Sequence, residues 1–189
     1  MSDGARSRRG LTIFFTGLSG AGKSTTAEAL RARLRGRTTR PVMLFDGDVV
    51  RRTLWPELGF SKGDRDTNIR RLGWLAAEVA RSGGVAICAS IAPYARPREE
   101  VRAMTAPDGG FVLVHMATPL EVCERRDPKG LYARARAGLL PEFTGVSDPY
   151  EPPDDAEIVL DLTETTPDAA ALRIVEFLQA EAYLDARSR

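Results

Sequence analysis

Eight residues near the start of the chain have the types and spacing of a phosphate-binding loop. Residues 17–24 read GLSGAGKS and match the pattern G-x-x-x-x-G-K-[ST]. The glycines let backbone N–H groups turn toward phosphate oxygens, and the helix that follows adds its partial positive charge. Lys23 is expected to reach the β- and γ-phosphates, and the Ser24 hydroxyl to ligate Mg²⁺. The motif predicts a nucleoside triphosphate site, the alternative being a glycine-rich turn without a ligand.

Asp46 and Asp48 are the carboxylates that the sequence offers to this site. They follow a short apolar run, and the end of a strand beside a phosphate loop faces the ligand crevice. Paired carboxylates there can orient metal-bound water and accept a proton from an attacking hydroxyl. The alternative is a polar turn in which Asp48 caps a helix. Because no Asn-Lys-x-Asp guanine signature occurs, nothing favours a GTPase over a kinase or a motor ATPase.

The elements that must position these residues alternate along the chain. Short apolar runs suited to buried strands occur at 11–16, 42–45, 85–89, 111–116 and 158–162. Amphipathic helical patterns occur at 24–34, 68–81, 98–104, 120–125 and from Thr166 and Pro167, as cap and first turn, to about Ala186. This alternation predicts a parallel α/β sheet with helices on both faces.

Composition limits the classes of function. The chain has 189 residues, 43% of them hydrophobic and 28% charged, which is typical of one soluble globular domain. A formal charge of +1 gives no overall field that would gather nucleic acid or an anionic membrane. Two distant cysteines, Cys88 and Cys123, and the single His115 predict neither a zinc site nor a disulfide framework.

Two segments fall outside the regular alternation. Residues 1–10 are polar, without an apolar signal core, so we expect a flexible tail and a cytoplasmic protein, with residues 11–189 forming one domain. Residues 127–153 combine glycines and prolines with charged residues. Connections of that length are usually functional lids or disordered.

Four blocks of the sequence together resemble one family, the adenylyl-sulfate kinases. The blocks are Gly17 to Thr25, the segment FDGDVVR at 45–51, the segment 58–71 that begins LGFSK and contains DRDTN, and the segment 123–153 that begins CERRDPKGLY. The second and fourth blocks are much more specific than the phosphate loop. The resemblance extends from about residue 11 to the end of the chain.

The resemblance implies a P-loop kinase fold with a five-stranded parallel sheet in the order 2-3-1-4-5 and a lid at about 125–153. It also implies ATP-dependent phosphorylation of the 3′-hydroxyl of adenosine 5′-phosphosulfate (APS), giving PAPS for sulfate assimilation. Mg²⁺ is the implied cofactor, and ATP and APS are the implied small-molecule partners. We further expect a homodimer that can associate with ATP sulfurylase. We expect no nucleic-acid or membrane partner.

Site roles follow from the same blocks. Lys23, Asp46 and Asp48 are the expected catalytic residues, with Asp46 preferred over Asp48 as metal-water organiser and base. The expected ATP-binding residues are Gly17, Leu18, Ser19, Gly20, Ala21, Gly22, Lys23, Ser24, Thr25, Arg126 and Lys129, and Arg125 adds a further positive charge to the lid.

Substrate binding is expected from a second set of residues. Arg51 and Arg65 offer planar forks that match phosphate and sulfate oxygens. The resemblance implies that both arginines contact the substrate, that Asn68 assists them, and that Phe60 and Phe143 sandwich the adenine, with core packing as the alternative for each ring. The full expected set is Asp46, Arg51, Phe60, Arg65, Asn68, Ile91, Lys129 and Phe143.

The chain departs from the family pattern at Ala92 and Ala95, where many members carry a serine and an arginine. Because alanine cannot form a phosphoserine, we expect direct in-line transfer from ATP to the substrate. Two rival hypotheses stay open, the first because such kinases share the phosphate loop and the lid, and the second because of the departures at Ala92 and Ala95. One is a kinase for another small molecule, such as gluconate, shikimate or an antibiotic hydroxyl, and the other is a non-catalytic nucleotide-binding subunit of a sulfate-activation complex.

Overall fold

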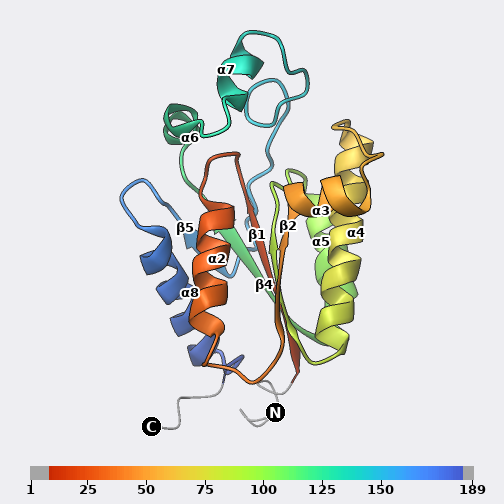
Figure 1. Cartoon of the computed structure of the whole chain (residues 1–189), viewed down its shortest axis with the longest axis vertical. Helices are drawn as coiled ribbons and strands as arrows, with labels where there is room; N and C mark the ends of the chain where they lie inside the picture. Colours follow the sequence, from red (N-terminus) through yellow and green to blue (C-terminus); the bar gives the residue numbers. More distant parts are fainter. Residues whose placement is uncertain (1–8, 185–189) are drawn as a thin grey trace.

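The computed structural model describes residues 9–184. Its five strands are parallel and lie in the order β2-β3-β1-β4-β5, which confirms the order implied by the resemblance (Figure 1). The strands are β1 (Gly10–Gly17), β2 (Val42–Asp46), β3 (Val85–Ala89), β4 (Gly109–Met116) and β5 (Ile158–Leu160).

Helices cover both faces of this sheet. On one face α2 packs against α8, and on the other α4 packs against α5 (Figure 1). The helices are α2 (Lys23–Leu34), α3 (Gly47–Leu54), α4 (Lys62–Arg81), α5 (Ala95–Thr105), α6 (Leu120–Arg126), α7 (Leu131–Arg136) and α8 (Pro167–Ala180).

Alternation along the central strand explains the two-sided core. Side chains of a strand point to opposite faces in turn. Leu11, Ile13 and Phe15 of β1 pack into the cluster shared with α2 and α8, whereas Phe14 packs into the cluster shared with α4 and α5. Because both faces are buried, β1 reads as a continuous apolar run rather than an alternating one.

Several predicted helices begin or end at the wrong residue. Helix α4 begins at Lys62 rather than at residue 68, because Ser61 accepts a hydrogen bond from the backbone N–H of Asp64 and caps it. Helix α8 does begin after its Thr166 cap, but it ends at Ala180 instead of near residue 186. The short helices α3 and α7 were not predicted, since each is too short to show a helical period.

The segment between α6 and β5 lies above the edge of the sheet where the strands end (Figure 1). It contains α7 and a parallel bridge between Thr144 and Asp148, so the disordered alternative for this segment is wrong. Gly10 already belongs to β1, while the rest of the predicted tail, except Arg9, lies outside the described residues. No helix within residues 9–184 combines the length and apolarity needed to span a membrane.

Candidate active site

The phosphate-binding loop connects β1 to α2 at the edge of the sheet where the strands end. Gly22 is the N-cap of α2 and has a φ of +94°, a left-handed conformation that favours glycine. A Cβ atom at this position would lie 2.6 Å from Cδ2 of Leu162. The backbone conformation therefore favours glycine at the last turn of the loop, and a larger residue would also displace the end of the Leu162 side chain.

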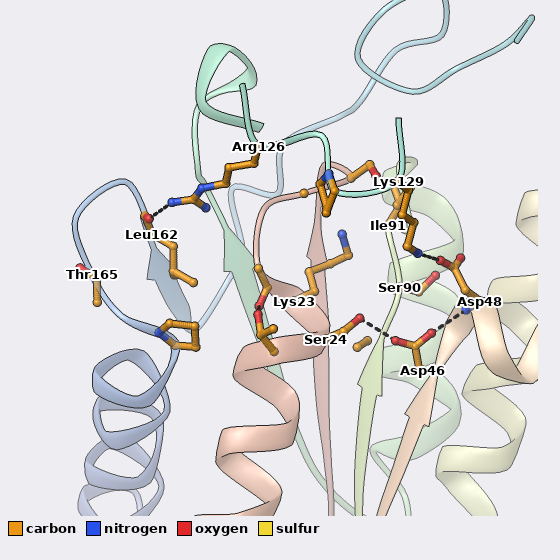
Figure 2. Close-up of a pocket in the computed structure, with 17 residues that line it drawn as sticks. Lys23, Ser24, Asp46, Asp48, Ser90, Ile91, Arg126, Lys129, Leu162 and Thr165 are labelled. Atoms are coloured by element: carbon orange, nitrogen blue, oxygen red, sulfur yellow. Dashed lines mark hydrogen bonds and ion pairs between the residues drawn. The ribbon is translucent and has the colours of Figure 1, made fainter. Parts of the chain in front are cut away.

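Lys23 is the cation at the centre of the loop. Its Nζ donates to the carbonyl oxygens of Gly17 at 2.9 Å and Leu18 at 2.7 Å, so the ammonium lies over the loop. Desolvation by burial lowers the pKa of Lys23 to about 8, and the nearby carboxylate of Asp48 opposes this shift. Figure 2 shows the side chain pointing into the space below the lid residues Arg126 and Lys129.

Ser24 and Asp46 connect the loop to α3. The Ser24 hydroxyl donates to Oδ2 of Asp46 at 2.6 Å (Figure 2). Oδ1 of Asp46 accepts from the backbone N–H groups of Asp48 and Val49, which makes Asp46 the N-cap of α3. The alternative in which Asp48 is the cap is therefore wrong, because Asp46, two residues earlier, fills that position.

Asp48 projects toward the lid. Nζ of Lys129 lies 2.6 Å from Oδ2 of Asp48, and this ion pair joins the lid to the start of α3 (Figure 2). Partial desolvation in the pocket opposes ionisation of Asp48, but the hydrogen bond from Lys129 and the charges of Lys129, Lys23 and Arg51 outweigh it, so its pKa is lowered. Asp48 is thus an anion paired with Lys129 and stabilised by the charges of Lys23 and Arg51.

These groups surround a pocket of about 420 Å³. Arg126 closes one side by donating to the carbonyl oxygen of Leu162 (Figure 2). The pocket brings together these residues predicted from sequence: Ser19, Gly20, Gly22, Lys23, Ser24, Thr25, Asp46, Asp48, Ile91, Arg126 and Lys129.

The sequence did not predict some of the residues that line this pocket. Ser90, Leu162, Thr165 and Pro167 also line the pocket; Leu162 and Thr165 come from the segment between β5 and α8, and Pro167 is the first residue of α8. The cap and proline at the start of α8 did mark that segment as a strand-to-helix connection. In a parallel sheet such connections meet at one edge, and this was the available signal.

Five of the predicted substrate residues lie outside this pocket. Arg51 and Phe60 form one pair, with the Arg51 guanidinium 4.8 Å from the centre of the Phe60 ring. Phe60 is 67% exposed, so its core-packing alternative is wrong. Burial lowers the pKa of Arg51, with Asp48 raising it and the charge of Arg65 lowering it further. This electrostatic coupling places Arg51 near both Asp48 and Arg65.

Arg65, Asn68 and Phe143 have protein partners. Arg65 is buried and pairs with Asp148 of the lid at 2.6 Å. Asn68 is buried and accepts a 2.7 Å hydrogen bond from the indole of Trp55. Phe143 is half-buried against the core beside α2 and meets Tyr132 edge-on, so packing is part of its role. Gly17, Leu18 and Ala21 lie in the loop without lining the main pocket.

Ala92 lies in a strained turn after β3. Its φ is +44°, a left-handed value uncommon for alanine, and its side chain is buried. Its carbonyl oxygen accepts from Arg98 Nη1 at 2.7 Å and from the Thr16 hydroxyl at 3.2 Å. Ala95, the other departure, donates its backbone N–H to Glu151. At both positions the hydrogen bonds are made by the backbone, and the Ala92 methyl group packs in the core.

The cysteines and the histidine play no part in the pocket. Cys88 and Cys123 are free and buried, and burial raises the pKa of both thiols. Burial lowers the pKa of His115, whose ring stacks on that of Tyr150. Within residues 9–184, no group of three or more histidine, cysteine or acidic side chains is arranged to hold a metal ion.

A parallel sheet of this order, with a phosphate-binding loop after its central strand and a cationic lid over the pocket, defines a P-loop kinase. The model of the adenylylsulphate kinase family matches residues 9–161, and the chain belongs to that family.

Individual relatives agree with this assignment. An adenylyl-sulfate kinase of Synechococcus sp. is 46% identical over 178 residues, covering 94% of this chain and 99% of the relative. A sulfate adenylyltransferase of Aspergillus clavatus is 45% identical over 181 residues, which are 95% of this chain but 32% of that protein.

Two solved structures are also similar. The APS kinase CysC of Mycobacterium tuberculosis, in complex with AMPPNP and APS, has a TM-score of 0.86 and 40% identity, over 90% of this chain and 98% of that one. A hexameric APS kinase from Thiobacillus denitrificans has a TM-score of 0.75 and 45% identity, over 95% of this chain and 31% of that one.

Proposed function

We propose that this chain transfers the γ-phosphoryl group of ATP to the 3′-hydroxyl of adenosine 5′-phosphosulfate, giving PAPS and ADP. The observation that carries the proposal is the pocket in which the phosphate-binding loop, two aspartates and two lid cations meet, in a chain of the adenylylsulphate kinase family. The relative solved with AMPPNP and APS supports the same pair of substrates.

Lys23, Arg126 and Lys129 bind the ATP phosphates in this proposal. Their positive charges converge on the pocket from the loop and from the lid. Phosphoryl transfer needs little covalent help from the protein, so positioning and charge stabilisation supply most of the catalysis. Closure of the lid over the pocket would also exclude water and so limit the hydrolysis of ATP.

The donors around Ser24 fit a magnesium ion. Mg²⁺ prefers oxygen ligands and is usually held by one or two protein groups together with substrate phosphates and water. The Ser24 hydroxyl and the Asp46 carboxylate are 2.6 Å apart at the floor of the pocket, with Asp48 in its wall. When bound, the ion would neutralise phosphate charge. Asp46 is the first candidate for orienting metal-bound water and accepting the hydroxyl proton, and Asp48 the second.

The second substrate is assigned to the residues near α3 and α4. Arg51 and Arg65 supply two cations for the phosphosulfate, and Asn68 assists them. Phe60 and Phe143 are proposed to sandwich the adenine, and Ile91 is proposed as a further contact from the pocket wall. The exposure of Phe60 supports this role, since its ring is available to a ligand.

We propose direct transfer without a phosphoenzyme at residue 92. Alanine has no hydroxyl, and the methyl group of Ala92 is buried. Its carbonyl contacts with Thr16 and Arg98 support a purely structural role for this turn.

The setting of the protein is also a proposal. We assign residues 11–189 to a single domain with a lid at 125–153, in the cytoplasm; residues 185–189 of this assignment lie outside the described residues. We keep a homodimer as the proposed assembly, although one similar structure is described as hexameric. Association with ATP sulfurylase is proposed because a longer sulfate adenylyltransferase contains a segment like this chain.

Mass spectrometry of the purified protein with Mg·ATP and APS tests the proposal, with gluconate, shikimate and adenosine as parallel acceptors. We expect APS to be the only acceptor that is phosphorylated, giving PAPS, and we expect the Lys23→Ala variant to form no PAPS. Phosphorylation of another acceptor in place of APS would identify the rival small-molecule kinase. ATP binding without transfer to any acceptor would identify the non-catalytic subunit.

A further inference from the structure

Arg65 is held by a single turn of the lid. Its Nη1 donates to the Thr144 hydroxyl and to Oδ2 of Asp148, both at 2.6 Å, and its Nη2 donates to the carbonyl oxygen of Glu142. All three acceptors belong to residues 142–148, which we name the Phe143 turn. Arg65 is 9% exposed, so this contact between α4 and the lid is largely shielded from water.

The Phe143 turn is compact. The carbonyl oxygen of Phe143 accepts from the backbone N–H groups of Val146, Ser147 and Asp148 at 3.0 to 3.1 Å. The Phe143 ring meets Tyr132 edge-on at 5.1 Å. Anything that moves Asp148 therefore moves the proposed adenine-stacking ring as well.

Tyr132 extends this connection to the ATP site. Its hydroxyl donates to the carbonyl oxygen of Ser19 in the phosphate-binding loop at 2.9 Å. The Phe143 turn is thus supported through Tyr132 on one side and contacts Arg65 on the other.

Asp148 also accepts a hydrogen bond from Tyr94, which lies just before α5. The hydroxyl of Tyr94 donates to Oδ2 of Asp148 at 2.6 Å, and Tyr94 is buried. Burial, together with this hydrogen bond, raises the pKa of Tyr94 to about 12, so the phenol stays protonated and remains a donor. One carboxylate oxygen thus joins α4, the lid and the segment before α5.

The guanidinium of Arg65 keeps donors for a ligand. A guanidinium has five N–H groups, and three of those of Arg65 are bound to the Phe143 turn. Within the described part of the chain, Nε of Arg65 donates to no protein acceptor. The contacts with the lid therefore orient the Arg65 guanidinium and leave some of its N–H groups to donate to an anion.

We propose that Asp148, held by Tyr94, is a positioning residue that locks the Phe143 turn onto Arg65 and so presents both the free donors of Arg65 and the Phe143 ring to APS. The inference rests on the proposed function and deepens it. In the opposite arrangement, the ion pair with Asp148 blocks Arg65 until the substrate displaces the carboxylate. That arrangement predicts tighter binding of APS when Asp148 loses its charge.

The test measures steady-state kinetics with APS and ATP varied separately, for the wild type, Asp148→Asn and Tyr94→Phe. Asp148→Asn keeps the size of the side chain and removes its charge, and Tyr94→Phe removes only the hydroxyl. We expect the KM for APS to rise at least tenfold in Asp148→Asn and by a smaller factor in Tyr94→Phe. The KM for ATP should stay within twofold in both.

Glu100→Gln is the matched control. Glu100 pairs with Arg70 at 2.5 Å, and with Arg96, on the face of α4 and α5 outside the lid. Its loss should leave both KM values unchanged. Thermal unfolding of every variant identifies any that is destabilised, and Tyr94→Phe, which keeps the ion pair, then carries the test.

An unchanged or lower KM for APS in folded Asp148→Asn would overturn the proposal, as would equal rises for APS and ATP. Calorimetric titration with APS is run in parallel, because it needs no turnover. Wild-type protein that bound APS without making PAPS would contradict the proposed function, while the titration of Asp148→Asn would still decide the role of Asp148.

Discussion

The Ser24 hydroxyl donates a 2.6 Å hydrogen bond to one oxygen of Asp46, whose other oxygen caps the N-terminus of α3. One carboxylate therefore joins the helix that follows the phosphate-binding loop to the element that carries Asp48. The proposed metal ligand Ser24 is thus in direct contact with Asp46, the first candidate base, and the same side chain caps the helix that carries Asp48, the second candidate.

Replacing Asp46 by asparagine separates its two roles. Asparagine caps helices about as well as aspartate, so the free energy of unfolding should change by less than about 0.5 kcal/mol. The negative charge beside Ser24 is lost, and we expect the turnover number to fall on the order of 100-fold, a typical cost of losing one electrostatic contact to the transition state. Rates of PAPS formation and chemical denaturation measure the two effects.

Asp46→Ala provides the comparison. It loses the cap as well as the charge, so it should be less stable than Asp46→Asn by about 1 kcal/mol. Wild-type turnover in Asp46→Asn would remove Asp46 from the proposed mechanism.

The pKa of Lys23 predicts how ATP use depends on pH. In the free enzyme Lys23 loses its proton as the pH rises through about 8. We therefore expect kcat/KM for ATP to fall above that pH, because this parameter reports on the free enzyme. Bound phosphates favour the ammonium, so ATP binding near pH 8 should take up protons, measured by calorimetry in buffers of different ionisation enthalpy.

The same shift has a consequence for stability. Between pH 8 and the ordinary value of 10.5 the unfolded chain holds a proton at Lys23 that the folded chain has lost. The contribution of Lys23 to the free energy of unfolding therefore rises with pH in this window. In Lys23→Ala both this contribution and the proton uptake should disappear, and persistence of the uptake would assign it to another group.

Lys129→Ala should affect activity and leave stability nearly unchanged. The side chains of Lys129 and Asp48 are 60% and 67% exposed, and such ion pairs contribute about 0 to 1 kcal/mol. Loss of a lid cation aimed at the phosphates should lower turnover on the order of 100-fold. Arg136→Ala is the lid control, because Arg136 pairs with Glu124 instead. Equal losses of turnover in the two variants would contradict a specific role for Lys129.

Phe60→Ala should weaken APS binding without weakening the fold. The ring is 67% exposed and contacts the Arg51 guanidinium. Aromatic stacking contributes about 1–3 kcal/mol per base, so the KM for APS should rise about 5- to 150-fold. The melting temperature should stay within about 2 °C, since little apolar area is buried by the side chain. A lower melting temperature with an unchanged KM would return Phe60 to a packing role.

The sequence alone determined the features that depend on neighbouring residues. The spacing of Gly17, Gly22 and Lys23 specified a phosphate-binding loop, because its chemistry uses consecutive backbone groups. Unbroken apolar runs such as 11–16 marked strands buried on both faces. The resemblance added the strand order and the family, and the structure and the family match confirm both.

Only the tertiary structure decided which distant groups meet. That the Ser24 hydroxyl meets Asp46, and that Asp148 meets both Arg65 and Tyr94, depends on contacts between segments far apart in the chain. Periodicity carries no such information, because a polar side chain in a loop looks the same whether it faces water or a buried guanidinium. The short helices α3 and α7 escaped prediction for a related reason, since packing and capping rather than a long amphipathic pattern stabilise them.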